Sequence, residues 1–279
     1  MAKAAAWGCI RCGRRWMGRP RTFTVDAVVL RHTDFGEADR LLVLYARGRG
    51  KLRALAKGVR RIRSRKAGHL EPLTPVRLFL AEGRDLAIVT QAEALETFPR
   101  LRRHLLRMTY ALHVAELADK FTYENEDHPG LYRLLVETLR RLETFPDADL
   151  VVRYYELHLL DLVGFRPELQ HCVRCGKALR PEPQFFAPRE GGVVCPHCGA
   201  AGGGLTAVSV DALRYLRHCQ RSSFREAARA HPAPVVHREM ETLLHGYLVH
   251  VLERRLNAPV FLNHLRRLGE MDGADDMSA

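Results

Sequence analysis

Two pairs of cysteines, each pair separated by two residues, constrain the fold of this chain more than any other feature. They are Cys172 and Cys175, followed by Cys195 and Cys198. Two intervening residues let one tight turn direct both thiolates to the same point, and two such turns supply the four ligands of a closed tetrahedral zinc site. The pattern predicts one structural Zn²⁺ ion in a zinc ribbon over residues 171–204.

The neighbours of these cysteines leave some detail open. Gly176 and Gly199 each follow a second cysteine, where a positive φ is often needed. His171 or His197 could replace one cysteine as a ligand. A closed set of four ligands leaves no position for water, so we expect a structural and not a catalytic metal. Redox-active dithiols would need a βαβ context, and the sequence shows none.

The other three cysteines have simpler interpretations. Cys9 and Cys12 form a third pair with the same spacing but without partners, so we interpret them as incidental. Cys219 lies on an apolar helical stripe and is predicted to be a small core residue. An odd total of seven cysteines without a secretion signal argues for reduced thiols or metal binding and predicts a cytoplasmic protein. Nucleoid association is the location expected if the basic segment binds DNA.

Charge is concentrated between Arg47 and Lys66, where twenty residues carry ten cations and no acid. Together with Arg40 these are the predicted nucleic-acid-binding residues: Arg40, Arg47, Arg49, Lys51, Arg53, Lys57, Arg60, Arg61, Arg63, Arg65 and Lys66. A solvated surface normally mixes both signs, so this segment favours a polyanionic ligand. On a strand Lys51, Arg53 and Lys57 share one face, and the residues beyond Gly58 should form a mobile loop.

Residues 21–97 have the pattern of a small barrel. Five short apolar runs separated by glycine and proline are predicted strands: Thr22–Arg31, Leu41–Tyr45, Lys51–Lys57, Val76–Leu80 and Leu86–Thr90. Five strands fit an oligonucleotide-binding (OB) barrel, although an SH3-like barrel fits this pattern nearly as well. Phe35 and Tyr45 are candidates for stacking on bases, with core or turn packing as the alternative.

Helical periodicity begins at Pro99, so we predict an α+β multidomain chain with a helical domain over residues 98–170 and 205–268. The first helix is predicted from Leu101, Leu105, Met108 and Leu112, and others from Leu131 to Leu142, from Asp147 to Leu162, after an N-cap at Ser209, and from Val235 to Leu256. Residues 1–20 are expected to be a disordered leader and residues 269–279 a flexible acidic tail.

Composition and missing motifs exclude several classes. The net charge of +12 favours nucleic acid as a partner, and no apolar run reaches the roughly 20 residues of a membrane helix. The sequence contains neither a P-loop nor an HExxH motif. Asp147 and Asp149 fit the N-terminus of a helix better than a metal site. We therefore predict no catalytic residues.

Several segments resemble the RecO family of bacterial recombination mediators. They are Phe35–Arg40 with Leu41–Leu44, Gly50–Arg60, Leu70–Leu73, Tyr155–Leu160, Gly164–Pro167 and Cys172–Gly176. Together they occur in the expected order over most of residues 22–200. The four cysteines are not universal in that family, so they support zinc without defining the function.

The resemblance implies an OB barrel and a helical domain with an inserted zinc ribbon. It also implies binding of single- and double-stranded DNA, strand annealing, partnership with RecR, contact with the tail of single-strand-binding protein, and indirect help in loading RecA. Arg102, Arg103 and Arg107 are possible cations at the rim of a site for that tail. Two alternatives stay open: an RNA-binding barrel with a zinc ribbon in translation or RNA processing, and an accessory fragment of a ligase or topoisomerase.

Overall fold

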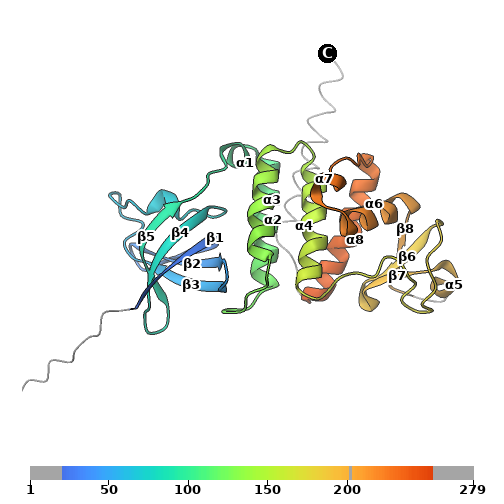
Figure 1. The fold of residues 1–279 in the computed structure, drawn as a ribbon, viewed down its shortest axis with the longest axis horizontal. Coiled ribbons are helices and arrows are strands. Elements are labelled where there is room, and N and C mark those ends of the chain that lie inside the picture. Colours follow the sequence, from blue (N-terminus) through green and yellow to red (C-terminus); the bar gives the residue numbers. More distant parts are fainter. Residues whose placement is uncertain (1–20, 201–202, 254–279) are drawn as a thin grey trace, which may run out of the picture.

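The computed structural model describes residues 21–200 and 203–253, arranged as an elongated molecule. A barrel forms one end, a layer of helices the middle, and a small sheet carrying the cysteines the other end (Figure 1). The expected leader with Cys9 and Cys12 and the expected acidic tail lie outside the described residues. Among the described residues, no helix combines the length and the apolarity needed to span a membrane.

The five strands of the barrel are β1 (Thr22–Phe35), β2 (Asp39–Ala46), β3 (Gly50–Ala56), β4 (Pro75–Ala81) and β5 (Ala87–Ala94). They close in the order β1-β2-β3-β5-β4, and only the short β3–β5 pair is parallel. The predicted five-stranded barrel is confirmed, and its closure through β3 and β5 is that of an OB barrel. A short 3₁₀ turn, η1 (Ala67–His69), precedes β4.

Strands β1 and β2 bury side chains on both faces. Val29, Leu42 and Leu44 point into the barrel core. Val28 and Tyr45, on the opposite face, belong to the core of the helical part. One outer side of the barrel is therefore covered by helices, which explains why β1 has consecutive buried residues and not strict alternation.

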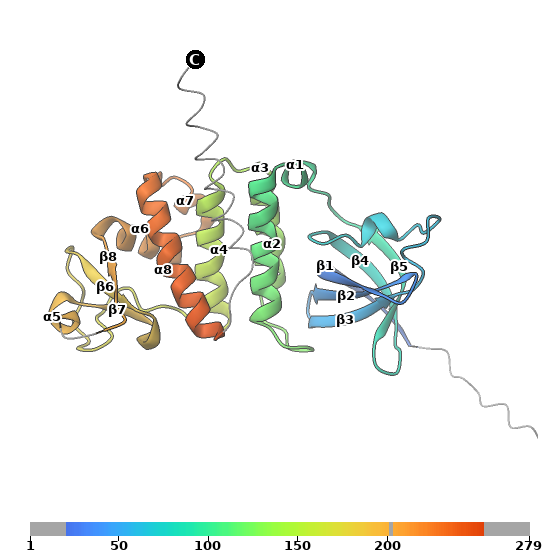
Figure 2. The same cartoon turned by 180° about the vertical axis from the view of Figure 1, so that it is seen from behind.

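The helical part consists of α1 (Pro99–Arg103), α2 (Leu105–Lys120), α3 (Leu131–Thr144), α4 (Ala148–Leu162), α6 (Val210–Arg221), α7 (Phe224–Ala227) and α8 (Pro234–Leu252). Helix α2 lies next to the barrel, while α4 contacts α2 and α3 on one side and α6 and α8 on the other (Figures 1 and 2). The predicted N-cap at Ser209 is confirmed, because its side chain accepts a hydrogen bond from Ala212 N. Asp147, expected at the N-terminus of a helix, caps α4 by accepting a hydrogen bond from Leu150 N.

The predicted apolar stripe of the first helix is correct only in part: Leu101 is buried and Met108 packs against the core, but Leu105 and Leu112 do not. His104 is extended and separates α1 from α2, and in α2 Leu105 and Leu112 are 57% and 41% exposed. The buried face of α2 is instead formed by residues such as Tyr110 and Val114. Alanines pack on both sides of this face, so the 4-3-4 leucine spacing did not identify the core.

A three-stranded sheet with order β7-β6-β8 carries the second cysteine pair. Its strands are β6 (Gln184–Ala187), β7 (Gly192–Val194) and β8 (Thr206–Val208). The turn η2 (Pro188–Glu190) and the one-turn helix α5 (Pro196–Gly199) lie between them. Tyr247 of α8 contacts Phe186 of β6 edge to face and donates a hydrogen bond to Phe165 O, so this sheet is packed on the helices.

One carboxylate joins the barrel to the helices. Asp119, at the end of α2, pairs with Arg31 Nε at 2.7 Å and with Lys51 Nζ at 2.9 Å. Desolvation by itself would raise the pKa of Asp119, but the hydrogen bonds from Arg31 and Lys51 outweigh it and lower the pKa below 3.8. The contact therefore favours the docked arrangement whenever Asp119 is ionised.

We expect Asp119→Asn to lower the free energy of unfolding by about 1–3 kcal/mol, because Arg31 and Lys51 lose their negative partner at a largely covered site. A carboxyl group with a lowered folded-state pKa stabilises the protein above its unfolded value of 3.8 and loses this effect as the pH falls through its folded value. Urea denaturation at several pH values should show that the difference in free energy of unfolding between wild type and variant is constant well above pH 3.8 and shrinks as the pH falls below 3.8.

The matched control is Asp161→Asn, which removes an exposed partner of Arg166. We expect that control to change stability by less than about 0.5 kcal/mol. Equal losses in the two variants at pH 7 would contradict the proposed role of Asp119.

Candidate metal centre and nucleic-acid interface

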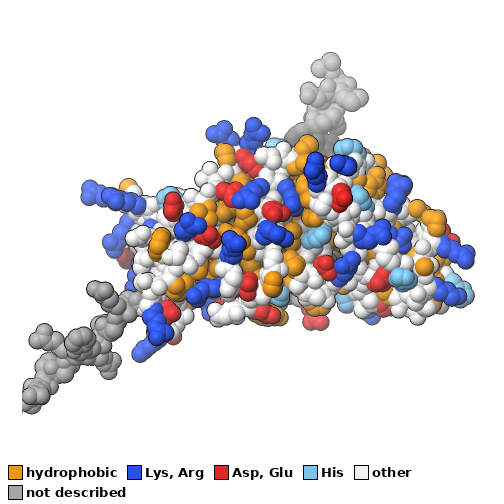
Figure 3. All heavy atoms as spheres, in the orientation of Figure 1, with side chains coloured by type: hydrophobic (Ala, Val, Ile, Leu, Met, Phe, Trp, Pro, Cys, Tyr) orange, Lys and Arg blue, Asp and Glu red, His pale blue; other side chains and the backbone are white. Residues whose placement is uncertain are grey.

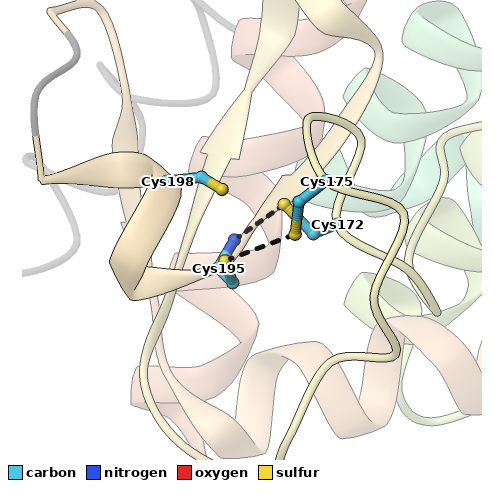
Figure 4. Close-up of side chains that lie close together, drawn as sticks. All are labelled: Cys172, Cys175, Cys195 and Cys198. Atoms are coloured by element: carbon cyan, nitrogen blue, oxygen red, sulfur yellow. Dashed lines mark hydrogen bonds between the residues drawn. The ribbon is translucent and has the colours of Figure 1, made fainter.

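The four predicted ligands meet at one point. The Sγ atoms of Cys172, Cys175, Cys195 and Cys198 all lie within 4.8 Å of one another. Figure 4 shows the sulfur atoms directed toward a common centre, two from the loop after residue 171 and two from the turn that starts α5. Among the described residues, no histidine belongs to this group. The geometry therefore favours four sulfur ligands over the alternatives with His171 or His197.

The two glycines beside these turns serve different purposes. Gly176 has a φ of 71° and donates its N–H to Cys172 O at 2.8 Å, as expected for a tight turn. Gly199 has no positive φ, but a Cβ atom there would lie 2.4 Å from a ring carbon of Phe185. Close packing on β6, and not backbone conformation, therefore favours glycine at position 199.

The thiols need a cation to ionise together. Desolvation raises the pKa of Cys172, but hydrogen bonds from the N–H groups of Cys195, Cys175 and Arg174 outweigh it and lower the pKa to about 6. Hydrogen bonding to Cys195 and burial raise the pKa of Cys198 to about 12. These opposite pKa shifts mean that, once Cys172 is ionised, Cys198 loses its proton with difficulty unless a metal ion compensates the negative charge. The donor set thus fits a thiophilic metal ion.

The ten cations of residues 47–66 are divided by β3 into two groups. Arg47 and Arg49 lie in the turn before β3, and Lys57 with the loop to Lys66 lies after it, about 20 Å farther along the strand. The Arg49 guanidinium stacks on the Phe23 ring at 4.3 Å. The basic segment is therefore not one continuous row of cations.

Between these groups, the outer face of β3 is covered. Lys51 and Arg53 pair across the sheet with Tyr45 and Val43, the same residues whose side chains face the helical core. The chain after α2 runs along β3, and a Cβ atom at Gly50 would lie 1.9 Å from Glu126 O. The helices and this chain segment together close the face on which the sequence analysis placed free cations.

Several predicted cations consequently have acidic partners. Lys51 binds Asp119, and Arg53 Nε lies 2.6 Å from Glu124 Oε1. Arg40 pairs with Asp34 and Glu71, and Arg60 reaches Asp34 at 3.4 Å. The Lys66 ammonium donates to Lys57 O and Val89 O. The acidic partners all lie outside residues 47–66, so counting acids within that segment could not reveal them.

Besides Arg49 and Lys66, whose contacts are given above, five predicted cations have no ion pair within 4 Å among the described residues. They are Arg47, Lys57, Arg61, Arg63 and Arg65, and all five are exposed. Ile62, between two of these arginines, is fully exposed. In Figure 3, Lys and Arg side chains project from the barrel at the end away from the helices. The loop after β3 is therefore the strongest candidate for contact with a polyanion.

The two aromatic candidates for base stacking, Phe35 and Tyr45, differ in their exposure to solvent. Tyr45 is fully buried, where it donates to Asp127 Oδ1 and accepts from His128 N, so it cannot stack on a base. Phe35, at the end of β1, is 54% exposed. It precedes the turn whose carbonyl groups bind the Arg60 side chain, which places an accessible ring next to the basic loop.

Two of the possible rim cations have structural partners. Arg102 donates to Pro72 O and Thr74 Oγ1, and Arg107 donates to carbonyl groups at the end of α3. Arg103 is exposed. A role of these three arginines in binding a peptide stays a prediction.

Two protein-family models match this chain, one over the barrel and one over the rest of the described chain. The model described as "Recombination protein O N terminal" matches residues 20–98, and "Recombination protein O C terminal" matches residues 102–259. The two matches cover the barrel and the helical part, including the cysteine-bearing sheet.

Comparison with curated proteins gives the same result. The chain is 38% identical over 250 residues to "DNA repair protein RecO" of Roseiflexus sp. strain RS-1, covering 90% of this chain and 88% of that protein. Proteins with the same name are 33% identical in Dehalococcoides mccartyi strain 195, over 90% of this chain and 99% of the relative, and 36% identical in Pelotomaculum thermopropionicum, over 92% and 100%. The similarity extends over nearly whole proteins.

We expect Cys175→Ser to reduce the metal content from one ion per chain to nearly none, because three sulfur ligands bind at least about a hundredfold more weakly than four. Elemental analysis of the purified protein measures the content. Cys219→Ala is the matched control, since Cys219 is buried in α6 outside the cluster and should leave the metal bound. Full retention of metal by Cys175→Ser would show that the ligands are wrongly assigned.

Proposed function

Because the chain belongs to the RecO family of DNA repair proteins, we propose that it is a non-enzymatic recombination mediator that binds single- and double-stranded DNA and anneals complementary strands. The observation that carries the proposal is the basic loop between β3 and η1, in which Lys57, Arg61, Arg63 and Arg65 are exposed and have no ion pair among the described residues. Arg47 and Arg49 extend the interface at the other end of β3, where the Phe23 ring already orients one guanidinium.

Annealing by such a surface needs only electrostatics. Two complementary strands repel each other through their phosphates, and a cationic surface lowers this repulsion without an active-site group. Exposed arginines with no acidic partner can pair with phosphates without first giving up an ion pair. The ion-paired Lys51 and Arg53 contribute less, because a phosphate must compete with Asp119 and Glu124 for them.

We further propose that the four-cysteine cluster holds one Zn²⁺ ion. Four thiolates favour zinc, and the closed set leaves no ligand position for a reacting water. The ion would fix the loop of Cys172 and Cys175 to the turn of Cys195 and Cys198, and so hold the small sheet in its fold. Its role is structural.

The proposed partners follow from the family. They are RecR, the acidic tail of single-strand-binding protein and, indirectly, the RecA recombinase that this pathway loads. The proposed location is the cytoplasm, in association with the nucleoid. The basic loop lies at the end of the barrel away from the helices, so the helical part stays accessible for protein partners while DNA is bound.

We expect the triple variant Arg61→Gln, Arg63→Gln, Arg65→Gln to bind a single-stranded oligonucleotide more weakly and with a smaller salt dependence. Loss of three phosphate contacts should reduce the slope of log affinity against log salt by about 2. Fluorescence anisotropy at several salt concentrations measures the slope. The control is Arg133→Gln with Arg238→Gln, two exposed arginines of α3 and α8 outside the basic loop. A slope unchanged in the triple variant would contradict the barrel interface.

Annealing itself provides a separate test. Without ATP, the wild-type protein should speed the pairing of complementary DNA strands at least about tenfold over the spontaneous rate, and the triple variant should lose most of that effect. A competition between DNA and RNA strands of equal sequence belongs to the same experiment. Strong preference for RNA, or turnover of a nicked duplex, would overturn the proposal.

A further inference from the structure

A second group of arginines surrounds a pocket at the other end of the molecule. The pocket has a volume of about 220 Å³ and lies between α6 and the chain segment that precedes β6. Its charged lining residues are Arg180, Glu182, Arg214, Arg217 and Arg221, and its apolar lining residues are Pro181, Val210 and Leu213. Four guanidinium groups thus face one carboxylate, which leaves a strong excess of positive charge.

The arginines of α6 form a row. Positions 214, 217 and 221 are three and four residues apart, so they share one face of the helix over about 10 Å. In Figure 3, Lys and Arg side chains gather where Figure 1 draws α6. Arg214 pairs with Asp211 at 3.1 Å, with both side chains well exposed. Arg180, Arg217 and Arg221 have no ion pair within 4 Å in residues 21–200 and 203–253.

Arg217 is held in position without a negative partner. Its Nε donates to Leu169 O at 2.6 Å, and its Nη2 is buried without a hydrogen-bond partner. Desolvation, and then the charge of Arg221, lower the pKa of Arg217. A fixed guanidinium that repels its neighbour is stabilised by an anion that binds between them.

We propose that this pocket binds a phosphodiester group of a second nucleic-acid strand. The proposal rests on the proposed function, because it assigns a second contact to the same class of ligand. A linear row of arginines fits a linear polyanion, whose charges recur along the strand, better than it fits a single carboxylate. The planar fork of arginine also matches the geometry of phosphate oxygens.

The position of the pocket gives it a distinct role. The basic loop lies on the barrel, whereas α6 lies on the far side of α4, so that α2, α3 and α4 separate the two (Figures 1 and 2). One protein molecule can therefore hold one strand at the barrel and another at α6. Such an arrangement raises the local concentration of one strand near the other, which is the condition that annealing requires.

The test is capture of a second strand by a protein that already holds a first one. An oligothymidine strand is immobilised and saturated with protein, and a labelled oligothymidine strand is added, so the two strands cannot pair. In the variant Arg180→Gln, Arg221→Gln, we expect about a tenfold loss of second-strand capture with first-strand affinity changed less than about twofold. Both substituted side chains are exposed, and Arg180 contributes only its carbonyl group to a hydrogen bond.

Three further arms make the result decisive. The control Arg133→Gln, Arg238→Gln removes the same charge outside the pocket and should capture the second strand like wild type. Glu182→Gln removes the one carboxylate among the described residues that line the pocket and should increase capture about twofold. Inorganic phosphate should compete with the second strand in the wild type only at millimolar concentration, because a single phosphate forms fewer contacts than a strand. Sedimentation velocity verifies that wild type and variants have the same oligomeric state.

The outcomes separate the two proposals. Unchanged second-strand capture by the variant Arg180→Gln, Arg221→Gln, or the same loss of capture in the control, overturns the inference about the pocket. Either result leaves the barrel interface intact. If the same variant loses affinity for an acidic peptide but captures the second strand as wild type does, the inference is also overturned, because the pocket would then serve a protein partner. Failure of the basic-loop variant to weaken first-strand binding contradicts the proposed function itself.

Discussion

The contact between the outer face of β1 and β2 and the helix α2 determines which parts of this molecule can act. Val28 and Tyr45 bury the apolar part of that contact, and Asp119 ties Arg31 and Lys51 to the end of α2. Once this face is covered, the cations of β3 become ion-paired, while the loop after β3 extends away from the helices. The same contact that orients the barrel therefore selects the part of its basic segment that is free for a polyanion.

A buried polar cluster adds a second constraint inside the helical part. Glu156 of α4 is fully buried, and its Oε1 lies 2.8 Å from His113 Nε2 of α2 and 3.2 Å from Arg153 Nη2. Paired buried charges contribute little net stability compared with apolar packing, but an unpaired one is costly. The cluster therefore disfavours any alternative register between α2 and α4, because a shift by one turn would separate Glu156 from His113 and leave it only Arg153 of its own helix. It fixes the layer that separates the two arginine-rich regions.

The sequence predicted the features that depend on local spacing. The two cysteine pairs, the five strands and the N-cap at Ser209 follow from residues near one another in the chain, and the structure confirms them. Interactions between distant segments could not be predicted in this way. The partners of Lys51 and Arg53 lie about seventy residues away, at Asp119 and Glu124. The predicted stripe of the first helix fails at Leu105 and Leu112, because the buried face of α2 includes alanines such as Ala111 and Ala115 that a count of leucines does not detect.

The four-cysteine cluster and the pocket beside α6 are parts of one local structure. The chain leaves Cys175, returns through a bridge between His171 and Ala178, and reaches Arg180 two residues later. Leu179 N donates to Gln170 O, and the Gln184 side chain donates to the carbonyl groups of Arg180 and Glu182, so the wall of the pocket is fixed to the cysteine-bearing loop. Closing four thiolates around one ion would restrict that loop and, with it, the distance between Arg180 and the α6 row. A structural metal can in this way support binding without contacting the ligand, because it determines whether the two sides of the pocket stay close enough to share one phosphate.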